Sequence, residues 1–285
     1  MKERAGDAGE TTDGPGKERQ AVGNEKSIVV RGVEIGGGIP KICVPVVETE
    51  EDAICEAAAQ AKRSAADLVE WRADYFGGVC DRDRVLRLLG KLRQRIGEMP
   101  LLFTYRTREE GGAGSRQLSA EEYRELNQTV AESRAADILD VEIRVGKEAF
   151  SGLAEAVHEA GGYVLASRHD FGKTPPEEEI LASFEQMEAW GADILKQAVM
   201  PEKQEDLLTL LLACRRASFR LSRPVVAISM GAMGTESRIC GEAVGSAMTF
   251  GCMAKASAPG QMDVQELSEI LLALHRARAG KKGCS

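Results

Sequence analysis

The chain has 285 residues, 43% of them apolar and 29% charged, which is typical of a globular protein with a substantial core. Its net charge of -8 repels phosphate backbones, so we expect no binding to nucleic acid. No apolar run approaches the ~20 residues of a membrane helix and no secretory signal is visible, so we expect no membrane association and a cytoplasmic location.

The N-terminal residues fall into two segments. Residues 1–26 mix charges with Gly, Thr and Pro and offer no periodic apolar face, so we predict a disordered tail. From Ser27 apolar residues alternate with polar ones, and three glycines follow at 36–38. We therefore predict a β-hairpin at 27–39, at the start of one folded domain that spans 27–285.

From Lys41 onward the chain repeats one unit, a β-rich run of about six residues followed by a loop and an amphipathic helix. The starts of the runs lie about 22 to 36 residues apart, as expected of βα units. Eight strands are predicted, at 41–47, 67–73, 101–106, 137–143, 163–169, 193–199, 225–230 and 247–253.

The helices between these strands carry start and stop signals. Gly191 ends the helix that reaches Trp190. An N-cap residue answered three positions later by a glutamate is predicted for three pairs, namely Ser119 with Glu122, Thr174 with Glu177, and Asp263 with Glu266.

Eight βα units in about 250 residues predict an α/β fold of the (β/α)8 TIM barrel type. An open doubly wound sheet is the structural rival. It would show a Gly-rich turn after the first strand, whereas VPVVETEED follows here without any glycine. We therefore favour the barrel, in which functional residues lie at the C-terminal ends of the strands.

Lys196 lies in DILKQAV, an otherwise largely apolar strand. A lysine that points into a barrel is costly unless it is used, and burial lowers its pKa, which supplies the free amine needed to form a Schiff base. Alternatively, the side chain points outward and reaches solvent between helices. The strand by itself favours neither interpretation.

His169 ends the neighbouring strand, where an imidazole is suited to moving protons near neutral pH. A single histidine in such a place is more often a structural hydrogen-bonding group. His158 and His275 lie within predicted helices and are weaker candidates.

Further polar residues lie at strand ends and in the loops that follow. Glu70 and Arg72 alternate in one strand and so share a face, while Arg106 ends the next strand and Glu110 follows it. They predict either a ligand site or a structural ion-pair network, and the two are compatible. Three residues in later loops are candidates for ligand contact, namely Arg238, Ser257 and Gln261.

The motifs together are similar to a known family. EWRADYF, FTYRTREEGG, SRHDF, ADILKQAVMP, SRICGEAVGSAMTFG and ASAPGQ occur in this order, and the chain resembles type I 3-dehydroquinate dehydratase from about Pro40 to Arg278. The resemblance implies the Schiff-base hydro-lyase of the shikimate pathway of aromatic amino acid biosynthesis. It also implies 3-dehydroquinate as substrate, no cofactor, no metal and a homodimer.

The resemblance assigns roles to individual residues. Lys196 would form the Schiff base, His169 would be the general acid and base, and Glu110 would orient the histidine. Arg238 would bind the substrate carboxylate. Five other residues would contact the substrate, namely Glu70, Arg72, Arg106, Ser257 and Gln261. Pro45 stands where some relatives have a substrate-contacting serine, so no contact is assigned to it.

Two alternatives remain at this point. A Schiff-base aldolase on the same fold would use a similar lysine, but it would need a phosphate-binding loop after strands seven and eight, for which GAMGTE is a weak candidate. A non-catalytic scaffold would be favoured if Lys196 or His169 were missing, and both are present.

Seven cysteines, an odd number, occur without a C-x-x-C pair or a histidine at metal-ligand spacing. We predict reduced thiols, most of them packed as small apolar side chains.

Overall fold

The computed structural model describes residues 26–114, 117–253 and 256–280. Almost all of the predicted tail, residues 1–25, lies outside these ranges. The strands are β1 (Ile28–Val30), β2 (Val33–Ile35), β3 (Lys41–Val46), β4 (Leu68–Arg72), β5 (Leu101–Thr104), β6 (Ile138–Glu142), β7 (Tyr163–Asp170), β8 (Ile194–Val199), β9 (Val225–Ser229) and β10 (Met248–Phe250). The helices are α1 (Glu51–Arg63), α2 (Arg82–Ile96), α3 (Ala120–Ser133), α4 (Lys147–Glu159), α5 (Glu177–Ala189), α6 (Gln204–Arg220), α7 (Glu236–Ile239), α8 (Gly241–Val244) and α9 (Val264–Arg278).

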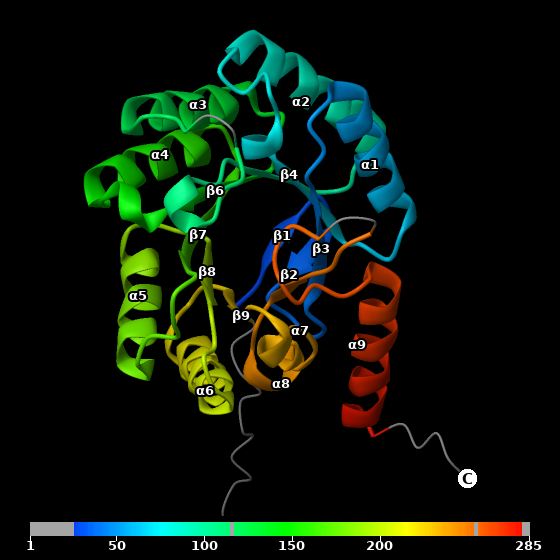
Figure 1. The fold of residues 1–285 in the computed structure, drawn as a ribbon, viewed down its shortest axis with the longest axis vertical. Coiled ribbons are helices and arrows are strands. Elements are labelled where there is room, and N and C mark those ends of the chain that lie inside the picture. The colour runs from blue at the N-terminus through cyan, green and yellow to red at the C-terminus, as the bar shows by residue number, and fades with distance from the viewer. Residues whose placement is uncertain (1–25, 115–116, 254–255, 281–285) are drawn as a thin grey trace, which may run out of the picture.

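Eight parallel strands form a barrel inside a ring of helices (Figure 1). The strands pair in the order β10-β3-β4-β5-β6-β7-β8-β9. A parallel bridge between Val225 and Ser246 joins the two ends, and the Ala247 N–H donates to the Val225 carbonyl at 2.7 Å. The predicted (β/α)8 barrel is confirmed, and the open sheet is wrong for this chain.

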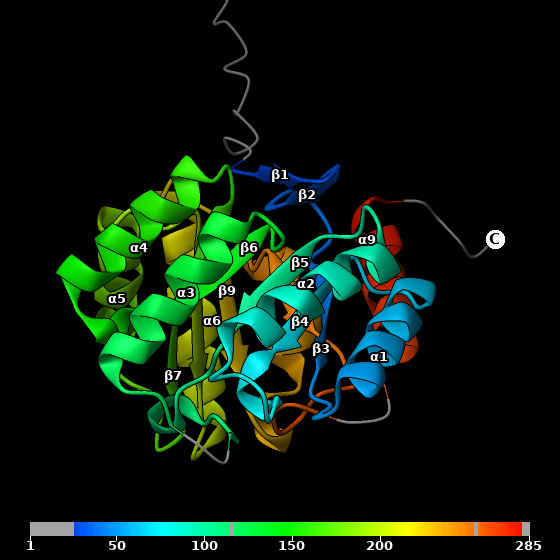
Figure 2. The same ribbon diagram turned by 90° about the horizontal axis from the view of Figure 1, so that it is seen from above.

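The predicted hairpin forms and covers the N-terminal end of the barrel (Figure 2). Ile28, Val30 and Ile35 are buried, and they pack in one cluster with the lowest inward-facing layer of the strands, which includes Leu68 and Leu102. This apolar plug leaves the opposite end of the barrel free to hold polar side chains.

Aspartates at the start of three strands repeat one contact. Each accepts a hydrogen bond from a main-chain N–H of the preceding strand: Asp67 from Ile42 at 2.7 Å, Asp137 from Leu101 at 2.8 Å, and Asp193 from Val164 at 2.9 Å. These bonds tie β4, β6 and β8 to their neighbours and so hold the inward-facing residues of those strands in register.

Two of the three predicted N-caps are confirmed. Ser119 and Glu122 form a reciprocal capping box, and the Asp263 carboxylate accepts the N–H of Glu266. The prediction for Thr174 is wrong, because its hydroxyl donates to the Met200 carbonyl instead. Two prolines follow it, and a proline disfavours helical backbone in the residue that precedes it. Helix α5 therefore begins only after Pro176.

The last two βα units depart from the regular repeat. After β9 the chain forms a short 3-10 turn and the four-residue helices α7 and α8 in place of one long helix. The final barrel strand is shorter than predicted, because β10 ends at Phe250 and Cys252 makes an isolated bridge to Asp263.

The described cysteines Cys43, Cys55, Cys80, Cys214, Cys240 and Cys252 are free thiols, as predicted, and Cys284 lies outside the described residues. Within the same ranges, none of the helices combines the length and apolar character that crossing a bilayer requires.

Candidate active site

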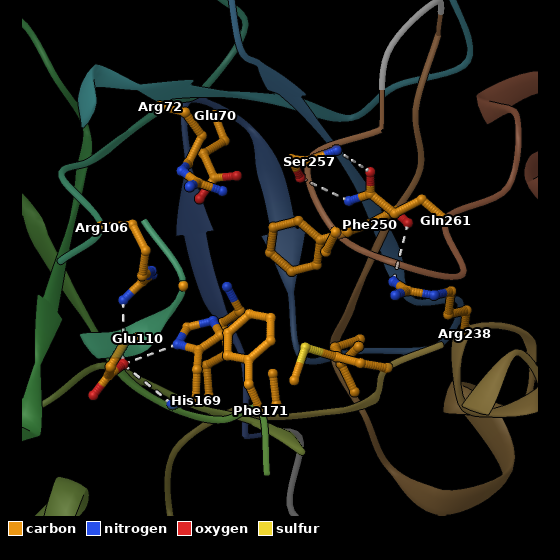
Figure 3. A pocket seen from close by; sticks show the side chains of 16 residues that line it. Glu70, Arg72, Arg106, Glu110, His169, Phe171, Arg238, Phe250, Ser257 and Gln261 are labelled. Carbon is orange, nitrogen blue, oxygen red and sulfur yellow. Dashed lines mark hydrogen bonds and ion pairs between the residues drawn. The ribbon is translucent and has the colours of Figure 1, made fainter. Parts of the chain in front are cut away.

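A cavity at the C-terminal ends of the strands gathers the candidate residues (Figure 3). All nine site residues predicted from the sequence line it: Glu70, Arg72, Arg106, Glu110, His169, Lys196, Arg238, Ser257 and Gln261. Its remaining lining is mostly apolar and comes from Gly111, Phe171, Ala198, Ile228, Met230, Phe250 and Ala258.

The cavity has two chemically different walls because successive strands contribute different inward-facing residues. Strands β4 and β7 contribute Glu70, Arg72 and His169, and the segment after β5 adds Arg106 and Glu110. Strands β9 and β10 contribute Ile228 and Phe250. A small ligand would therefore meet ionic groups on one side, and on the other an apolar surface bordered by the polar side chains of Arg238, Ser257 and Gln261 (Figure 3).

Lys196 points into the barrel from β8, so the outward orientation is wrong for this residue. Its side chain is buried, and Nζ lies 4.3 Å from the centroid of the Phe250 ring. Burial lowers the pKa of the Lys196 ammonium, and the nearby Arg106 guanidinium adds to this effect, while Glu70 and Asp140 oppose it. The result is an amine that is more nucleophilic than an exposed lysine.

His169 lies at the end of β7, the strand that pairs with β8, and it forms a close pair with Glu110. Glu110 Oε2 is 2.9 Å from His169 Nδ1 and also accepts the main-chain N–H of His169 at 3.1 Å. Because Oε2 acts as an acceptor, we assign a hydrogen to Nδ1, which leaves the lone pair on Nε2. The Phe171 ring stacks beside the imidazole with centroids 6.5 Å apart.

Burial shapes the protonation of this pair. Burial and the carboxylate of Glu142 raise the pKa of Glu110 to about 8. Burial lowers the pKa of His169 well below its ordinary value, and the cations of Arg106, Lys196 and Arg72 contribute. His169 is thus uncharged at neutral pH and able to accept a proton.

Two glycines allow Glu110 to turn back toward β7. Gly111 has a φ of +85°, and a Cβ atom on it would lie 2.3 Å from the Phe171 ring. A Cβ atom on Gly112 would lie 2.1 Å from the carbonyl oxygen of Arg106. Side chains at either position would push the loop away from His169.

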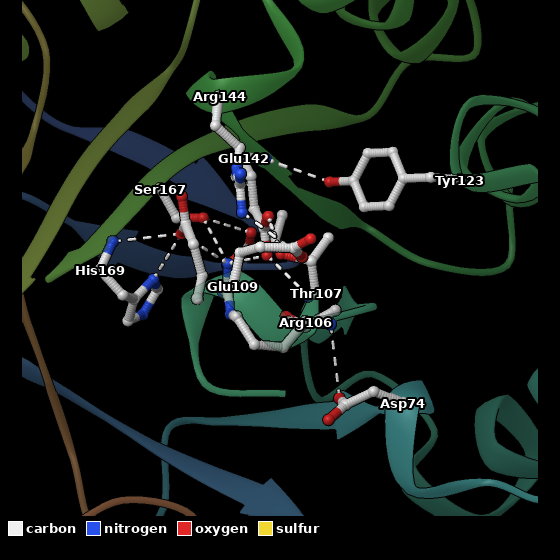
Figure 4. Close-up of polar contacts among 12 residues, drawn as sticks. Asp74, Arg106, Thr107, Glu109, Tyr123, Glu142, Arg144, Ser167 and His169 are labelled. Atoms are coloured by element: carbon white, nitrogen blue, oxygen red, sulfur yellow. Dashed lines mark hydrogen bonds and ion pairs between the residues drawn. The ribbon is translucent and has the colours of Figure 1, made fainter. Parts of the chain in front are cut away.

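Arg106 lies at the centre of a buried ionic network (Figure 4). Its Nη1 contacts Glu142 Oε1 at 2.9 Å and the Ser167 hydroxyl at 2.8 Å, and it reaches Glu110 at 3.5 Å. Its Nη2 contacts Asp140 at 2.5 Å. The ion-pair interpretation of these charged residues is therefore correct, and the network supports the loop that carries Glu110.

Arg72 and Glu70 are held by other partners. Nε and Nη2 of Arg72 each donate at 2.8 Å to the two oxygens of Asp74, which is a bidentate pair. Glu70 Oε1 accepts the hydroxyl hydrogen of Thr104 at 2.8 Å. Both side chains are thus fixed on the same wall of the cavity, as their alternation in the sequence predicts.

Arg238, on α7, differs from the other two arginines of the cavity because no carboxylate of the described residues pairs with it. Nη2 donates to the Pro259 carbonyl at 2.9 Å and Nη1 reaches the Phe250 carbonyl at 3.5 Å. Its Nε is buried and finds no partner in the described chain. Burial lowers the pKa of Arg238 to about 10, which shows that its positive charge is poorly stabilised, so an anion bound beside it would be stabilising.

Ser257 and Gln261 lie in the loop after β10 and bond to each other. The Ser257 N–H donates to Gln261 Oε1 at 2.8 Å, and Gln261 Nε2 donates to the Ser257 hydroxyl at 2.9 Å. The Gly231 N–H and Arg238 both donate to the Pro259 carbonyl, so this loop is also attached to the segment that carries Arg238.

Sequence reasoning missed four polar residues that support the site, namely Asp74, Asp140, Glu142 and Ser167. The signal was present in the sequence, because Asp140 and Glu142 alternate in DILDVEI and Asp74 continues the alternation of Glu70 and Arg72 in EWRAD. Ser167 likewise stands two positions before His169.

The cavity unites three chemical functions. A buried amine of lowered pKa can add to a carbonyl carbon, a neutral imidazole held by a carboxyl group can take and return a proton, and an unpaired guanidinium can bind a carboxylate. The arrangement suits a small carbonyl compound that carries a carboxylate.

Comparison with known proteins gives one consistent result. A family model for type I 3-dehydroquinase matches residues 42–278. The 3-dehydroquinate dehydratase of Listeria innocua is 44% identical over 249 residues, which cover 87% of this chain and 98% of that protein. The enzyme of the same name from Bacillus licheniformis is 42% identical over 253 residues, covering 88% and 99%.

Solved structures agree with these sequence matches. A type I 3-dehydroquinate dehydratase from Clostridium difficile, solved with covalently modified comenic acid, superposes with a TM-score of 0.85 at 38% identity and covers 88% of this chain and 98% of its own. A 3-dehydroquinate dehydratase from Geobacillus kaustophilus also gives 0.85, at 37% identity, covering 90% and 98%.

Proposed function

The chain belongs to the type I 3-dehydroquinase family and is a carbon-oxygen lyase of the hydro-lyase class, and from this premise we propose that it removes water from 3-dehydroquinate through a Schiff base on Lys196. The product is 3-dehydroshikimate. Residues 27–285 are proposed to form the catalytic domain.

The first step in this proposal is imine formation. Lys196 Nζ adds to the C3 carbonyl carbon of the substrate, the two amine hydrogens leave with the carbonyl oxygen as water, and uptake of one proton from solvent gives a protonated imine; the later hydrolysis returns this proton. The buried position and lowered pKa of the amine support this role. A protonated imine withdraws electrons more strongly than a ketone, so it acidifies the neighbouring C2–H bond.

The elimination is assigned to His169. Its Nε2 takes the proton from C2, and the electron pair forms an enamine. The enamine then expels the C1 hydroxyl, which leaves as water after His169 returns the proton to it. Water finally hydrolyses the conjugated imine, so Lys196 is regenerated and the net change is the loss of one water molecule.

Substrate recognition is assigned to the two walls of the cavity. Arg238 binds the carboxylate with its unpaired guanidinium. The substrate's ring and hydroxyls meet Glu70, Arg72, Arg106, Ser257 and Gln261. The terminal nitrogens of Arg106 are already bonded to Asp140, Glu142 and Ser167, so it adds positive charge at the cavity wall more than a free hydrogen-bond donor.

One observation carries this function: the buried amine of Lys196 lies in the same cavity as the His169–Glu110 pair, on the adjacent strand. An aldolase would also use the amine, but the unpaired Arg238 is better explained by a carboxylate than by a phosphate loop. The resemblance further leads us to propose a cytoplasmic homodimer.

Borohydride trapping tests the assignment. Native protein treated with 3-dehydroquinate and borohydride should gain a substrate adduct on Lys196, seen by mass spectrometry of peptides. Lys196→Ala should gain no adduct and should lose turnover, which is measured from the ultraviolet absorbance of the enone product. Lys173→Ala, which removes an exposed lysine from the loop after β7, is the matched control and should behave as native.

His169→Ala separates the two roles. The amine remains, so an adduct should still form, while turnover falls by about 10²- to 10⁴-fold. An adduct on another lysine would overturn the assignment of Lys196 as the nucleophile. Nearly normal turnover of His169→Ala would overturn the assignment of His169 as the base.

A further inference from the structure

Phe250 connects two functional groups of the cavity. It is the last residue of β10, and its buried side chain projects into the cavity (Figure 3). The ring lies beside Lys196, with its centroid 4.3 Å from Nζ. The main-chain carbonyl of the same residue accepts a hydrogen bond from Arg238 Nη1 at 3.5 Å. Phe250 therefore contacts the amine through its ring, and through its main chain the guanidinium that is proposed to bind the carboxylate.

Within the part of the chain that the structure describes, the Phe250 ring is the direct partner of this amine. Nζ makes no hydrogen bond and no ion pair there. Two carboxylates stabilise its charge from a longer distance, and both are bonded to other groups. Glu70 accepts the hydroxyl hydrogen of Thr104 at 2.8 Å. Asp140 accepts that of Ser167 at 2.6 Å. A positive charge on Nζ therefore meets a ring face at close range and the carboxylates of these residues only beyond ion-pair distance.

Other strands of the barrel surround Nζ with charged and titratable groups. These are Cys43 on β3, Glu70 on β4, Arg106 after β5, Asp140 on β6 and His169 on β7. Burial and the Arg106 guanidinium lower the pKa of the Lys196 ammonium. An imine formed at the same nitrogen would be buried beside the same guanidinium, so its protonated form would be disfavoured for the same reasons. The proposed reaction needs that protonated form, so a group that stabilises positive charge at Nζ would assist it.

An aromatic ring has the electrostatic properties that this position requires. The face of a phenyl ring is negative, and it attracts a cation that lies within about 6 Å of the ring centre. A carboxylate in the same place would also stabilise the cation, but it could take the proton of the imine and leave a neutral imine, which is a weaker electron sink. A phenyl ring has no basic atom. It therefore stabilises the protonated imine without accepting its proton.

We propose that the Phe250 ring is the electrostatic partner of the reacting nitrogen and keeps the imine on Lys196 protonated while His169 removes the C2 proton. The inference rests on the proposed function, and it adds a chemical role for the apolar wall of the cavity. Phe171, the other phenylalanine of the lining, stacks with the imidazole of His169 instead. The two rings of the cavity thus have different partners.

Fluorinated phenylalanines at position 250 test the proposal, because fluorine withdraws electrons from the ring face and changes the shape of the ring little. Native protein is compared with full-length variants that carry one, two or five fluorines on this ring, the last being Phe250→pentafluorophenylalanine. The main-chain carbonyl that meets Arg238 is the same in all of them. Similar melting temperatures will show that the variants fold.

The first readout is the pH dependence of the acetylation of Lys196 by acetic anhydride, measured without substrate by mass spectrometry of peptides. Acetic anhydride reacts with the unprotonated amine, so the midpoint of this profile reports the pKa of Lys196. Loss of the attraction to the ring disfavours the ammonium, so the midpoint should move to lower pH, by roughly 0.5 to 1.5 pH units with five fluorines and by less with one or two. Phe171→pentafluorophenylalanine is the matched control and should leave the midpoint unchanged. An unmoved midpoint throughout the Phe250 series would overturn the proposal.

The second readout is the pH profile of kcat, which reports titrating groups in the complex with substrate. Because the ring keeps the imine protonated, the alkaline limb of this profile should move to lower pH as fluorines are added. A ring that acts only through packing would lower kcat equally at all pH values, and that result would overturn the role at the imine. The acetylation profile needs no turnover, so it separates this inference from the proposed function. A moved midpoint without a borohydride adduct on Lys196 would confirm the contact between ring and ammonium and overturn the Schiff base.

Discussion

Replacing Glu110 with glutamine should make the fold more resistant to rising pH. The pKa of Glu110 is raised to about 8 by burial and by Glu142, above its ordinary value of 4.5. A carboxyl that holds its proton more tightly in the folded chain contributes stability below pH 4.5, and this stability is lost as the pH rises through 8. Glutamine has no proton to lose, so Glu110→Gln avoids this loss. Its side-chain oxygen can still accept the N–H groups of His169.

The size of the effect follows from the two pKa values. At about 1.4 kcal/mol per pKa unit, the change from 4.5 to about 8 corresponds to a loss of up to about 5 kcal/mol across the whole range. Most of this loss falls between pH 5 and pH 8.5, where it amounts to about 4 kcal/mol. For a domain of this size that is roughly 8 to 15 °C in melting temperature.

Melting temperatures of native protein and Glu110→Gln between pH 5 and pH 8.5 provide the assay. The melting temperature of Glu110→Gln should rise steadily relative to that of the native protein as the pH rises. Glu109→Gln is the matched control, because Glu109 is the adjacent exposed residue and hydrogen bonds lower its pKa. A constant difference between native protein and Glu110→Gln at all pH values would refute the raised pKa of Glu110.

Two other changes have clear expected outcomes. Arg238→Lys should raise KM by roughly tenfold or more with a much smaller change in kcat and melting temperature, because lysine keeps the charge but loses the bidentate geometry. An unchanged KM would mean that Arg72 or Arg106, and not Arg238, binds the substrate carboxylate. Ile35→Ala removes a fully buried side chain from the hairpin plug and should cost about 2 to 5 kcal/mol, a drop of roughly 5 °C or more in melting temperature. Turnover of the folded fraction should stay normal, since the plug lies at the end of the barrel away from the cavity; a loss of turnover without a loss of stability would contradict this separation.

Much of the fold could be predicted because its periodicities are local. Alternation in a strand and three- or four-residue spacing in a helix can be read from neighbouring residues, and eight repeats of the pair allow few architectures. The prediction failed where a local signal met a stronger local constraint. Thr174 has the spacing of an N-cap, but the two prolines after it delay the helix to Glu177.

The direction of Lys196 could not be predicted in the same way. The strand that carries it is buried along its whole length, so both faces read as apolar and alternation gives no answer. The answer depends on closure of the barrel, which makes one face of every strand an interior. Closure in turn rests on contacts between residues far apart in the sequence, such as Met248 of β10 with Lys41 of β3.

The partners of the arginines also depend on closure, and they decide what each arginine can do. Arg72 ends β4, Arg106 follows β5 and Arg238 lies on α7, and the sequence does not show which of them is paired with a carboxylate. Among the residues that the structure describes, Asp74 neutralises Arg72, and Asp140 and Glu142 neutralise Arg106, while Arg238 meets only main-chain carbonyls. An arginine already paired with carboxylates stabilises the site, whereas an unpaired buried one gains most from an anionic ligand. Substrate recognition in this barrel therefore depends less on where the arginines lie than on which of them the fold leaves without a carboxylate.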